Sequence, residues 1–411
     1  MDIKNNPGYS GFPAQALAEA QSIKEDLDLL RQDLHRHPEL GNAEHYTSAL
    51  LENRLRALGL DVKRILGTAL VATLHGTGPG RNAQKPAAVA LRADMDALPI
   101  TEATGCSFSS ENAGVMHACG HDIHMTAAVG TAAILSKHAG LLNGDVVFLF
   151  QPDEEGAGGA LRMIDEGALE GVGAVFGGHV NPEIPLGKIG IKYGAFYAAS
   201  DVVSVTVHGK AAHSSTPEKG ADALLAAAEM VTLLCDLRPS SGDPAVLRFG
   251  EFRSGNVCNV IADTAYFSGI ARTFGQQNVS DMRRKIVQTI AGICSLKNVT
   301  ADIDIGKSYG GVVNREAETR LFEECARSVM GSENVVVIQE PKMGTEDFGY
   351  FIDACDAGSF LSIGTGTGTG QSVHTPDFLP DIDAAVCASA VYSATLVEYL
   401  NSLFVKNTGA K

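Results

Sequence analysis

Two short segments are apolar over their whole length, and this restricts the chain to folds that bury a strand on both faces. Residues 146–150 and 174–178 contain only valine, phenylalanine, leucine, alanine and glycine. Such runs are typical of strands in a parallel sheet, because helices cover both of its faces. The two runs therefore favour an α/β architecture over an antiparallel sandwich or a helical bundle.

Helical and strand-like segments alternate around these runs. Leucines recur at helical spacing over residues 17–34 and 50–58, and strand-like runs follow at 69–74 and 87–91. A helix rich in small residues is predicted over 125–135. This alternation predicts an open α/β sheet, in which ligands bind beyond the carboxyl ends of the strands.

The pattern changes at about residue 195. Val203, Val205 and Val207 alternate with polar residues, and the segments from there to residue 307 follow the order β-α-β-β-α-β. Because 411 residues exceed what one core usually supports, two domains are expected. We predict a larger α/β domain formed by 1–194 and 308–411, with a ferredoxin-like α+β domain inserted at 195–307.

The composition of the chain indicates which classes of binding partner and which cellular compartment to expect. The net charge of −16 and the absence of basic stripes argue against nucleic acid or an anionic membrane as the main partner. The first residues have no export-signal pattern, and no window has 18 uninterrupted apolar residues. The eight cysteines are scattered through the chain, which indicates free thiols in a reducing compartment. We therefore expect a cytoplasmic protein.

Residues 116–124 concentrate groups that bind metal ions. Cys119 and His121 flank a single glycine there, so both side chains could reach one ion. Further ligand types follow strand-like runs downstream, at Glu155, His179 and His374. Thiolate, imidazole and carboxylate form the ligand set of Zn²⁺, and the last two also suit Mn²⁺ or Co²⁺.

Five candidate ligands are too many for one tetrahedral zinc ion that keeps a position open, so two metal ions fit better. Adjacent Glu154 then remains as the general base. Each residue also has a simpler interpretation: a lone histidine after a strand is usually structural, and a Glu-Glu pair is usually solvated. Cys119 and His121 could instead be a thiol nucleophile and its base, although neighbours on one turn are poorly placed for this.

The chain resembles the M20 metallopeptidase family, in its amidohydrolase branch of hippurate, N-acyl-amino-acid and auxin-conjugate hydrolases. The resemblance covers most of the chain. It rests on the ordered motifs at residues 35–40, 92–99, 117–122, 151–156, 178–179, 209–213, 259–261, 272–274 and 344–348, and on His374.

The resemblance implies a zinc-exopeptidase-like catalytic domain that holds two divalent metal ions per subunit. The ions would be Mn²⁺ or Zn²⁺, with Co²⁺ or Ni²⁺ as further candidates. Glu154 matches the general base of the family, and Asp96 matches a carboxylate that orients the site. The implied metal ligands are Cys119, His121, Glu155, His179 and His374.

The inserted domain of the family mediates dimerisation and closes over the site. By this resemblance, His213 stabilises the oxyanion in its own or in the partner's site, while Asn259 and Arg272 approach the substrate. An arginine there is suited to grip a carboxylate with two hydrogen bonds. On residue type alone, the simpler interpretations, a loop histidine for His213 and a sheet-surface charge for Arg272, would be preferred. A homodimer is expected, with a homotetramer as the alternative.

The expected reaction is cleavage of the amide bond of a small N-acyl amino acid, or a related conjugate, to a carboxylic acid and an amino acid. Metal-bound hydroxide would attack the carbonyl while Glu154 takes and relays the proton. A dipeptidase or aminopeptidase on the same scaffold is one alternative. A non-catalytic binding protein of this fold is another.

Three positions depart from the pattern of the family branch. Asp153 stands where alanine usually precedes the Glu pair, and an extra acid there could raise the pKa of Glu154 or point outward. Glu218 follows Pro217 where histidine is common. His374 is followed by an acidic variant at 375–378. All three concern the choice of substrate more than the chemistry.

Overall fold

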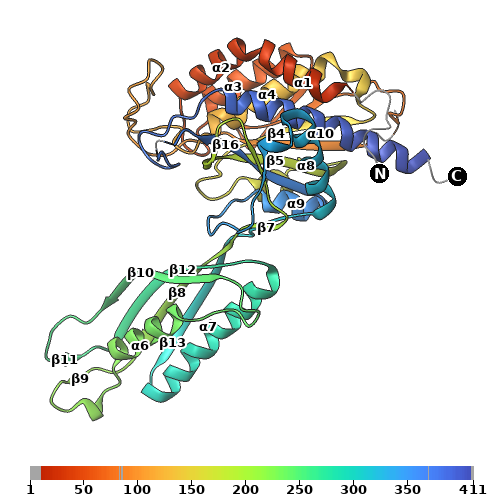
Figure 1. Cartoon of the computed structure of the whole chain (residues 1–411). Coiled ribbons are helices and arrows are strands. Elements are labelled where there is room, and N and C mark those ends of the chain that lie inside the picture. The colour runs from red at the N-terminus through yellow and green to blue at the C-terminus, as the bar shows by residue number, and fades with distance from the viewer. Residues whose placement is uncertain (1–10, 83, 85–86, 369, 409–411) are drawn as a thin grey trace. The chain divides into compact units, whose positions relative to one another are not determined.

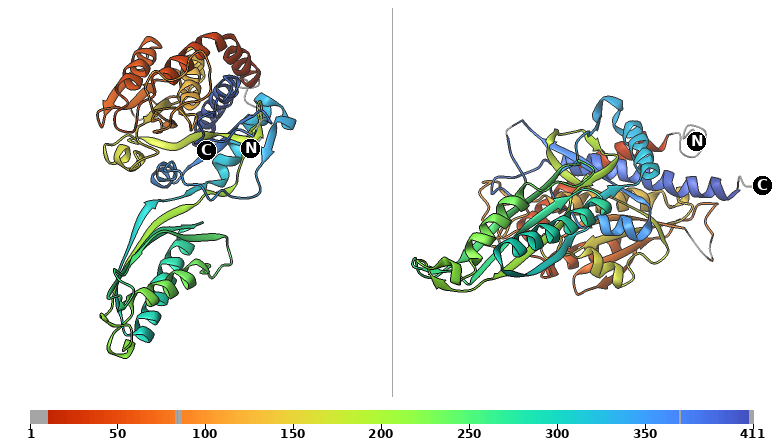
Figure 2. Two further views of the ribbon diagram at one scale, coloured as in Figure 1. Left: turned by 90° about the vertical axis from the view of Figure 1, so that its left-hand side faces the viewer. Right: turned by 90° about the horizontal axis from the view of Figure 1, so that it is seen from below.

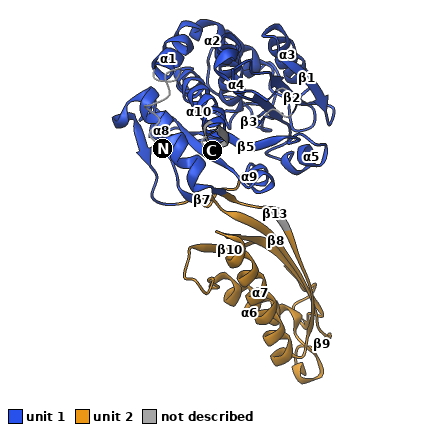
Figure 3. Cartoon of the chain, turned by 90° about the vertical axis from the view of Figure 1, so that its right-hand side faces the viewer, with its two compact units in different colours: residues 1–194, 313–340, 347–411 blue, residues 195–312, 341–346 orange. Residues whose placement is uncertain are grey.

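The computed structural model describes residues 11–82, 84, 87–368 and 370–408. The expectation that the N-terminus carries no export signal rests partly on residues 1–10, which lie outside this part. The chain divides into two compact units (Figure 3). Unit 1 comprises 1–194, 313–340 and 347–411, and unit 2 comprises 195–312 and 341–346. The second boundary therefore falls a few residues after the expected one, because the last strand of unit 2 continues to Tyr309.

Unit 1 contains a mixed sheet of eight strands (Figure 1). Its centre is parallel: β3 pairs with β4 and β5, and β5 pairs with β16. The edge strand β1 and its neighbour β2 run antiparallel. In spatial order the strands are β1 (Asp61–Ile65), β2 (Ala69–Leu74), β4 (Asp145–Gln151), β3 (Ala88–Asp94), β5 (Val172–Pro185), β16 (Gly358–Gly366), β6 (Ile189–Ile191) and β15 (Val335–Val337).

Eight α-helices in the described part of unit 1 accompany this sheet. The single opening helix predicted over 17–34 is in fact two, because the backbone leaves helical geometry at Ile23 (φ −102°, ψ 7°). The helices are α1 (Phe12–Ser22), α2 (Lys24–Arg36), α3 (His45–Ala57), α4 (His121–Lys137), α5 (Ala160–Asp165), α8 (Glu316–Met330), α9 (Gly349–Cys355) and α10 (Asp383–Thr408).

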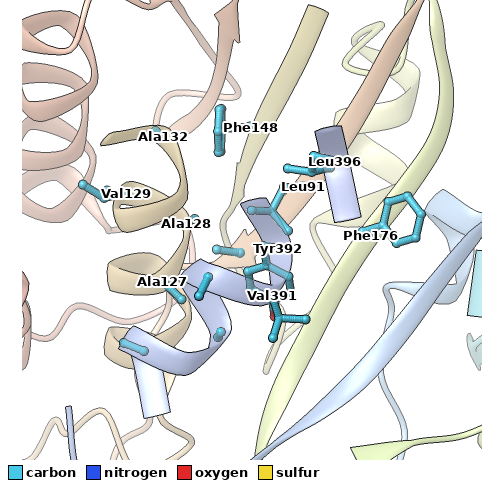
Figure 4. Close-up of a cluster of buried hydrophobic side chains, with 14 of the residues drawn as sticks. Leu91, Ala127, Ala128, Val129, Ala132, Phe148, Phe176, Val391, Tyr392 and Leu396 are labelled. Carbon is cyan, nitrogen blue, oxygen red and sulfur yellow. The ribbon is translucent and has the colours of Figure 1, made fainter. Parts of the chain in front are cut away.

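The core of unit 1 lies where α4 and α10 pack against the central strands (Figure 4). Alanines such as Ala128 and Ala132 face this contact from α4, and small side chains allow two helices to approach closely. Leu91, Phe148 and Phe176 enter it from β3, β4 and β5, all without solvent exposure. This packing holds the start of α4 next to the strand ends.

Unit 2 is an antiparallel sheet with α6 and α7 side by side on one face (Figure 2). The strand order β10-β12-β8-β13 is that of a ferredoxin-like sandwich, so the predicted β-α-β-β-α-β order and the α/β fold class are confirmed. Its main elements are β8 (Ala199–His208), α6 (Ala223–Cys235), β10 (Ala245–Ser254), β12 (Thr264–Thr273), α7 (Gln276–Lys297) and β13 (Thr300–Tyr309).

Short elements complete the chain. Two small ribbons pair β9 (Ala212–His213) with β11 (Val260–Ile261) and β7 (Gly194–Tyr197) with β14 (Val312–Asn314), and single 3-10 turns lie at Ala139–Leu141, Pro217–Lys219 and Ser332–Asn334. No disulfide joins any two of the eight cysteines, all of which the structure describes. Within the described ranges, no helix combines the length and apolarity needed to cross a membrane.

Candidate metal centre

The carboxyl ends of β3, β4, β5 and β16 carry the candidate site. Cys119 precedes α4, His121 begins it, and Glu155 follows β4. His179 lies within β5, and His374 follows β16. Three overlapping sets of ligand atoms each lie within 4.8 Å of one another: Cys119, His121 and His179; Cys119, Glu155 and His374; and His121, Glu154 and Glu155. The structure thus brings together all five predicted ligands and the predicted base.

Close contacts link these sets. The Sγ atom of Cys119 lies 3.2 Å from Nε2 of His179 and 3.2 Å from Nε2 of His374. The same Nε2 atom of His374 lies 3.0 Å from Oε1 of Glu155. Cys119 therefore stands between two imidazoles contributed by segments far apart in the sequence.

Local backbone geometry places these side chains. Gly120 has a φ of 84°, a left-handed conformation that reverses the chain between Cys119 and the first turn of α4. A Cβ atom at this position would lie 2.7 Å from Cγ2 of Val180. His374 also has a positive φ, 64°, and its backbone N–H donates to the carbonyl of Ala118 at 2.8 Å. That bond ties the C-terminal loop to the cysteine turn.

Backbone carbonyls set the imidazole tautomers. Nδ1 of His121 donates to the carbonyl of Asp96, and Nδ1 of His179 donates to the carbonyl of Val180, each at 2.8 Å. The Nε2 lone pairs are then left for a metal ion. In the described part of the chain, Nε2 of His121 and Oδ1 of Asp96 are buried with no hydrogen-bond partner. Such unsatisfied acceptors fit a bound cation, so these residues suit the metals that their chemistry implies.

The electrostatics of the centre also favour a cation. Burial alone would lower the pKa of His121, but the carboxylates of Asp94 and Asp96 reverse this effect and raise it to about 10. Burial and the charges of Glu155 and Glu154 raise the pKa of the Cys119 thiol well above its usual value. A nucleophilic cysteine needs the opposite shift, so this environment disfavours the thiol-nucleophile alternative. A thiol in such a place ionises when a metal ion lies against it.

The third imidazole of the motif, that of His124, has a structural role. Its Nδ1 pairs with Oδ1 of Asp94 at 2.6 Å, and its Nε2 accepts from the backbone N–H of Val180 at 3.0 Å. Both nitrogens are therefore used, and burial lowers the pKa of the ring. Asp94 also lies 3.6 Å from Nε2 of His121. In the sequence, Asp94 lies within the motif at residues 92–99 but was given no role of its own.

Behind Asp94 lies a buried ionic network that sequence reasoning did not assign. Arg92 donates to Asp94 at 2.6 Å, to Gln151 at 2.8 Å and to Asp347 at 3.1 Å. Gln151 and the N–H of Ala160 also donate to Asp347. The only sequence signal was the resemblance, whose motifs include these residues. The network joins the ends of β3 and β4 to the loop before α9.

The turn that carries Glu154 and Glu155 is held by two carboxylates. Glu44 accepts from the N–H of Asp153 at 3.0 Å, and Asp96 accepts from the N–H of Glu155 at 2.9 Å. Asp153 itself adopts a φ of 60°, and its own carboxylate accepts from the N–H of Ala157 at 3.4 Å. Asp153, which departs from the alanine usual in the family branch, therefore stabilises the turn through its own carboxylate.

Unit 2 carries the remaining predicted residues. His213 is exposed on β9, and Nδ1 of its ring accepts from the N–H of Ser215 at 3.2 Å. The N–H of Ser214 donates to the carbonyl of Asn259, so Asn259 lies beside the residue that follows His213. Arg272, in β12, donates to the carbonyl of Met343 at 2.5 Å. Glu218 lies in the 3-10 turn Pro217–Lys219.

Residues 90–398 match the model of peptidase family M20/M25/M40. The chain belongs to this family. As an M20 hydrolase it is 36% identical over 379 residues to a probable hydrolase of Synechocystis sp., covering 90% of this chain and 95% of that protein.

Two further proteins are similar to this M20 chain over most of its length. An N-acetyl-L-cysteine deacetylase of Bacillus subtilis is 33% identical over 372 residues, covering 90% of this chain and 86% of that protein. A crystal structure from Bacillus subtilis, described as a dinuclear metal binding peptidase from the M20 family, superposes with a TM-score of 0.82 at 30% identity. It covers 93% of this chain and 99% of that one.

Proposed function

We propose that this M20 hydrolase cleaves the amide bond of small N-acyl amino acids, using two divalent metal ions held by Cys119, His121, Glu155, His179 and His374. The observation that supports this most strongly is that Glu154 shares a set of neighbouring atoms with two of these ligands, His121 and Glu155. The description of the Bacillus subtilis structure as dinuclear supports the number of metals. When bound, the metal pair supplies an activated water and polarises the amide carbonyl.

Glu154 acts as the general base in this proposal. Its side chain is buried and lies at the centre, within 4.8 Å of the ligand atoms of His121 and Glu155. A carboxylate at that place can accept a proton from the attacking water and deliver it to the leaving nitrogen. Asp96 keeps Glu155 and His121 in position through the hydrogen bonds described above.

Unit 2 supplies the remaining groups in this proposal. Because Nδ1 of His213 accepts from a backbone N–H, its neutral ring carries the proton on Nε2 and can donate it to a developing oxyanion. Arg272 is proposed to bind the carboxylate of the amino acid, with Asn259 beside His213. A homodimer is part of the proposal. It is supported by the outer face of α6, where Leu225 and Leu233 are 46% and 52% exposed on a helix whose only polar residues are Glu229 and Thr232.

The substrate class is tested by release of free amine from N-acetyl, N-benzoyl and indole-acyl amino acids and from simple dipeptides. The protein is first stripped of metal and reloaded with Mn²⁺, Zn²⁺ or Co²⁺. Metal-dependent release from the acylated compounds is expected, as the deacetylase relative indicates. Hydrolysis of dipeptides alone would move the chain to the peptidase alternative. Silence on every substrate with metal bound would favour a binding protein.

The general base is tested by Glu154→Gln. The amide cannot accept a proton, so turnover should fall at least about 100-fold while the metal content stays unchanged. Glu170→Gln, an exposed position of the same unit, is the matched control and should keep full activity. Retained turnover in Glu154→Gln would remove Glu154 from the mechanism.

A further inference from the structure

A second group of metal-ligand side chains lies apart from the ligands of the proposed centre. His35, at the end of α2, meets Glu102 and Cys106 from the loop between β3 and α4, and their ligand atoms all lie within 4.8 Å of one another. Nε2 of His35 lies 3.4 Å from Oε1 of Glu102, and Sγ of Cys106 lies 3.8 Å from the same oxygen. The side chains of His35 and Glu102 are only 1% and 5% exposed, whereas Cys106 is partly exposed, so an ion can reach the group from solvent on the side of Cys106.

The hydrogen bonds of His35 leave a lone pair facing this group. Nδ1 of His35 pairs with Oδ2 of Asp122 at 2.8 Å, and Nε of Arg31 donates to the same oxygen at 3.0 Å. Because Nε–H of Arg31 can only donate, the shared Asp122 oxygen is an acceptor, and it accepts from Nδ1–H of His35 as well. The Nε2 of a neutral His35 is then an acceptor. This pairing of histidine with carboxylate is the arrangement that commonly orients a metal-binding imidazole.

Glu102 presents a charged oxygen to that lone pair. Burial would raise its pKa, but hydrogen bonds from the N–H of Ser110 and the hydroxyl of Thr104 lower it, so Glu102 is ionised at neutral pH. Two acceptors therefore face each other across 3.4 Å. Such a contact is favourable only when a cation, either a proton or a metal ion, lies between them.

The spacing suits a tetrahedral zinc ion. Zinc bonds of about 2.0 to 2.1 Å to nitrogen and oxygen and about 2.3 Å to sulfur imply ligand separations of about 3.3 Å for N to O and about 3.5 Å for S to O. The separations of 3.4 Å and 3.8 Å differ from these by a few tenths of an ångström. Ser109, whose hydroxyl lies 3.5 Å from Sγ of Cys106, or a water can complete the shell.

The net charge of this group is the same with and without a bound divalent ion. Arg31 and Asp122 neutralise each other, so a divalent ion would meet the carboxylate of Glu102 and the thiolate of Cys106, and the net charge would be zero. A proton on His35 with a neutral thiol gives the same total. Exchange of two protons for one Zn²⁺ therefore carries no added burial of net charge.

We propose that His35, Glu102 and Cys106 form a binding site for a further divalent cation, separate from the centre around Cys119, and that its donor set favours Zn²⁺. The ion would join α2 to residues 102–106. The same loop reaches the metal centre, because the N–H of Ala103 donates to the carbonyl of Pro376 at 2.7 Å, two residues beyond His374. Occupancy would thus fix the loop beside that ligand.

The number of bound metals tests this site. The stripped full-length protein is loaded with Co²⁺, dialysed and analysed for metal per chain and for sulfur-to-cobalt absorption. Cys106→Ser and Glu102→Gln should each bind one ion fewer than the wild type, and Cys106→Ser should also lose part of the thiolate absorption. The matched control Cys258→Ser removes an exposed thiol of unit 2 and should change neither. Equal metal content in wild type, Cys106→Ser and Glu102→Gln would overturn the proposal.

Alkylation of the unaltered protein gives a second measurement that depends on no substitution. Zn²⁺ should slow modification of Cys106 by iodoacetamide at least about tenfold and leave that of Cys258 unchanged, because a metal-bound thiolate is shielded. Modification of Cys106 at the same rate with and without Zn²⁺ would contradict the site. Neither measurement uses turnover, so failure of the proposed amidohydrolase activity would be seen separately.

Discussion

At the scale of single residues, the partner of Nδ1 decides what each imidazole near the centre can do. His121 and His179 donate Nδ1–H to backbone carbonyls and keep Nε2 for a metal ion. His124 lies three residues beyond His121, but its two nitrogens are occupied by Asp94 and Val180. The three are the same residue type, so spacing alone could not separate the candidate ligands from the structural histidine.

Gly120 makes a prediction at this scale. Gly120→Ala introduces left-handed strain, at about 1–2 kcal/mol, and places a Cβ atom 2.7 Å from Val180, which adds about 1–3 kcal/mol. Gly59→Ala is the matched control, since its φ of 85° is almost equal to the 84° of Gly120 and nothing lies within 4 Å of the added atom. Urea unfolding should show the larger loss for Gly120→Ala.

Metal affinity should separate the same two variants. Only Gly120 lies between two proposed ligands, so its substitution should displace Cys119 or His121 and weaken metal binding, whereas Gly59→Ala should bind normally. Equal unfolding costs and equal affinities in the two variants would show that the contact with Val180 is unimportant.

At the scale of elements, the packing of α10 on α8 buries a carboxylate outside the metal centre. Glu398 of α10 is 8% exposed, and its Oε2 has no hydrogen-bond partner among the residues described. Burial, together with the charge of Glu324 on α8, raises the pKa of Glu398 to about 7. The folded protein therefore keeps a proton that the unfolded chain releases near its ordinary value of 4.5.

This raised pKa predicts how stability depends on pH. The stabilising contribution is complete below about pH 4.5 and is lost as pH rises through about 7. The side chain of the Glu398→Gln variant stays neutral at every pH. The free energy of unfolding of this variant, relative to that of the wild type, should therefore increase between about pH 4.5 and pH 7, by up to about 3 kcal/mol at pH 8. Urea unfolding at several pH values measures this gain. Parallel profiles for wild type and Glu398→Gln, like those expected of the control Glu170→Gln, would refute the assignment.

At the scale of the whole molecule, His213 of each chain in the proposed dimer can act either in the site of its own subunit or in the site of the partner subunit. His213→Ala should lower turnover about 100-fold, because an oxyanion donor is lost. The ring of His213 is exposed on unit 2, so we expect it to serve the site of the other subunit. A heterodimer of Glu154→Gln and His213→Ala chains would then contain one complete site.

Co-expression of the two variants tests this expectation. Activity should return to about one quarter of the wild-type rate, because half of randomly mixed dimers are heterodimers and each has one complete site of two. Sedimentation should show dimers in the same preparation. Mixtures no more active than their components would place His213 in its own subunit's site.

Much of this organisation was predictable because it is written in local patterns. The apolar run at 146–150 predicted β4 to within one residue at each end, whereas β5 continues seven residues beyond the run at 174–178. The alternating valines predicted β8 in the inserted unit. The prediction of a single opening helix was wrong, because the helical spacing of apolar residues continues through Ile23, where the backbone breaks. Helix α9 begins at Gly349, directly after Asp347 and Phe348, and the carboxylate of Asp347 accepts hydrogen bonds from Gln151 and Arg92, a contact that no local pattern predicts.

The sequence by itself determined the fold class and predicted a dispersed set of candidate ligands, because buried strands need continuous apolar residues and metal ions need particular donor atoms. Only the tertiary structure decided what supports those ligands. Arg92 meets Asp347 across 255 positions, and Glu44 meets Asp153 across 109. Contacts between such distant residues leave no periodic signal in the chain, and they form only when the sheet brings its strand ends together.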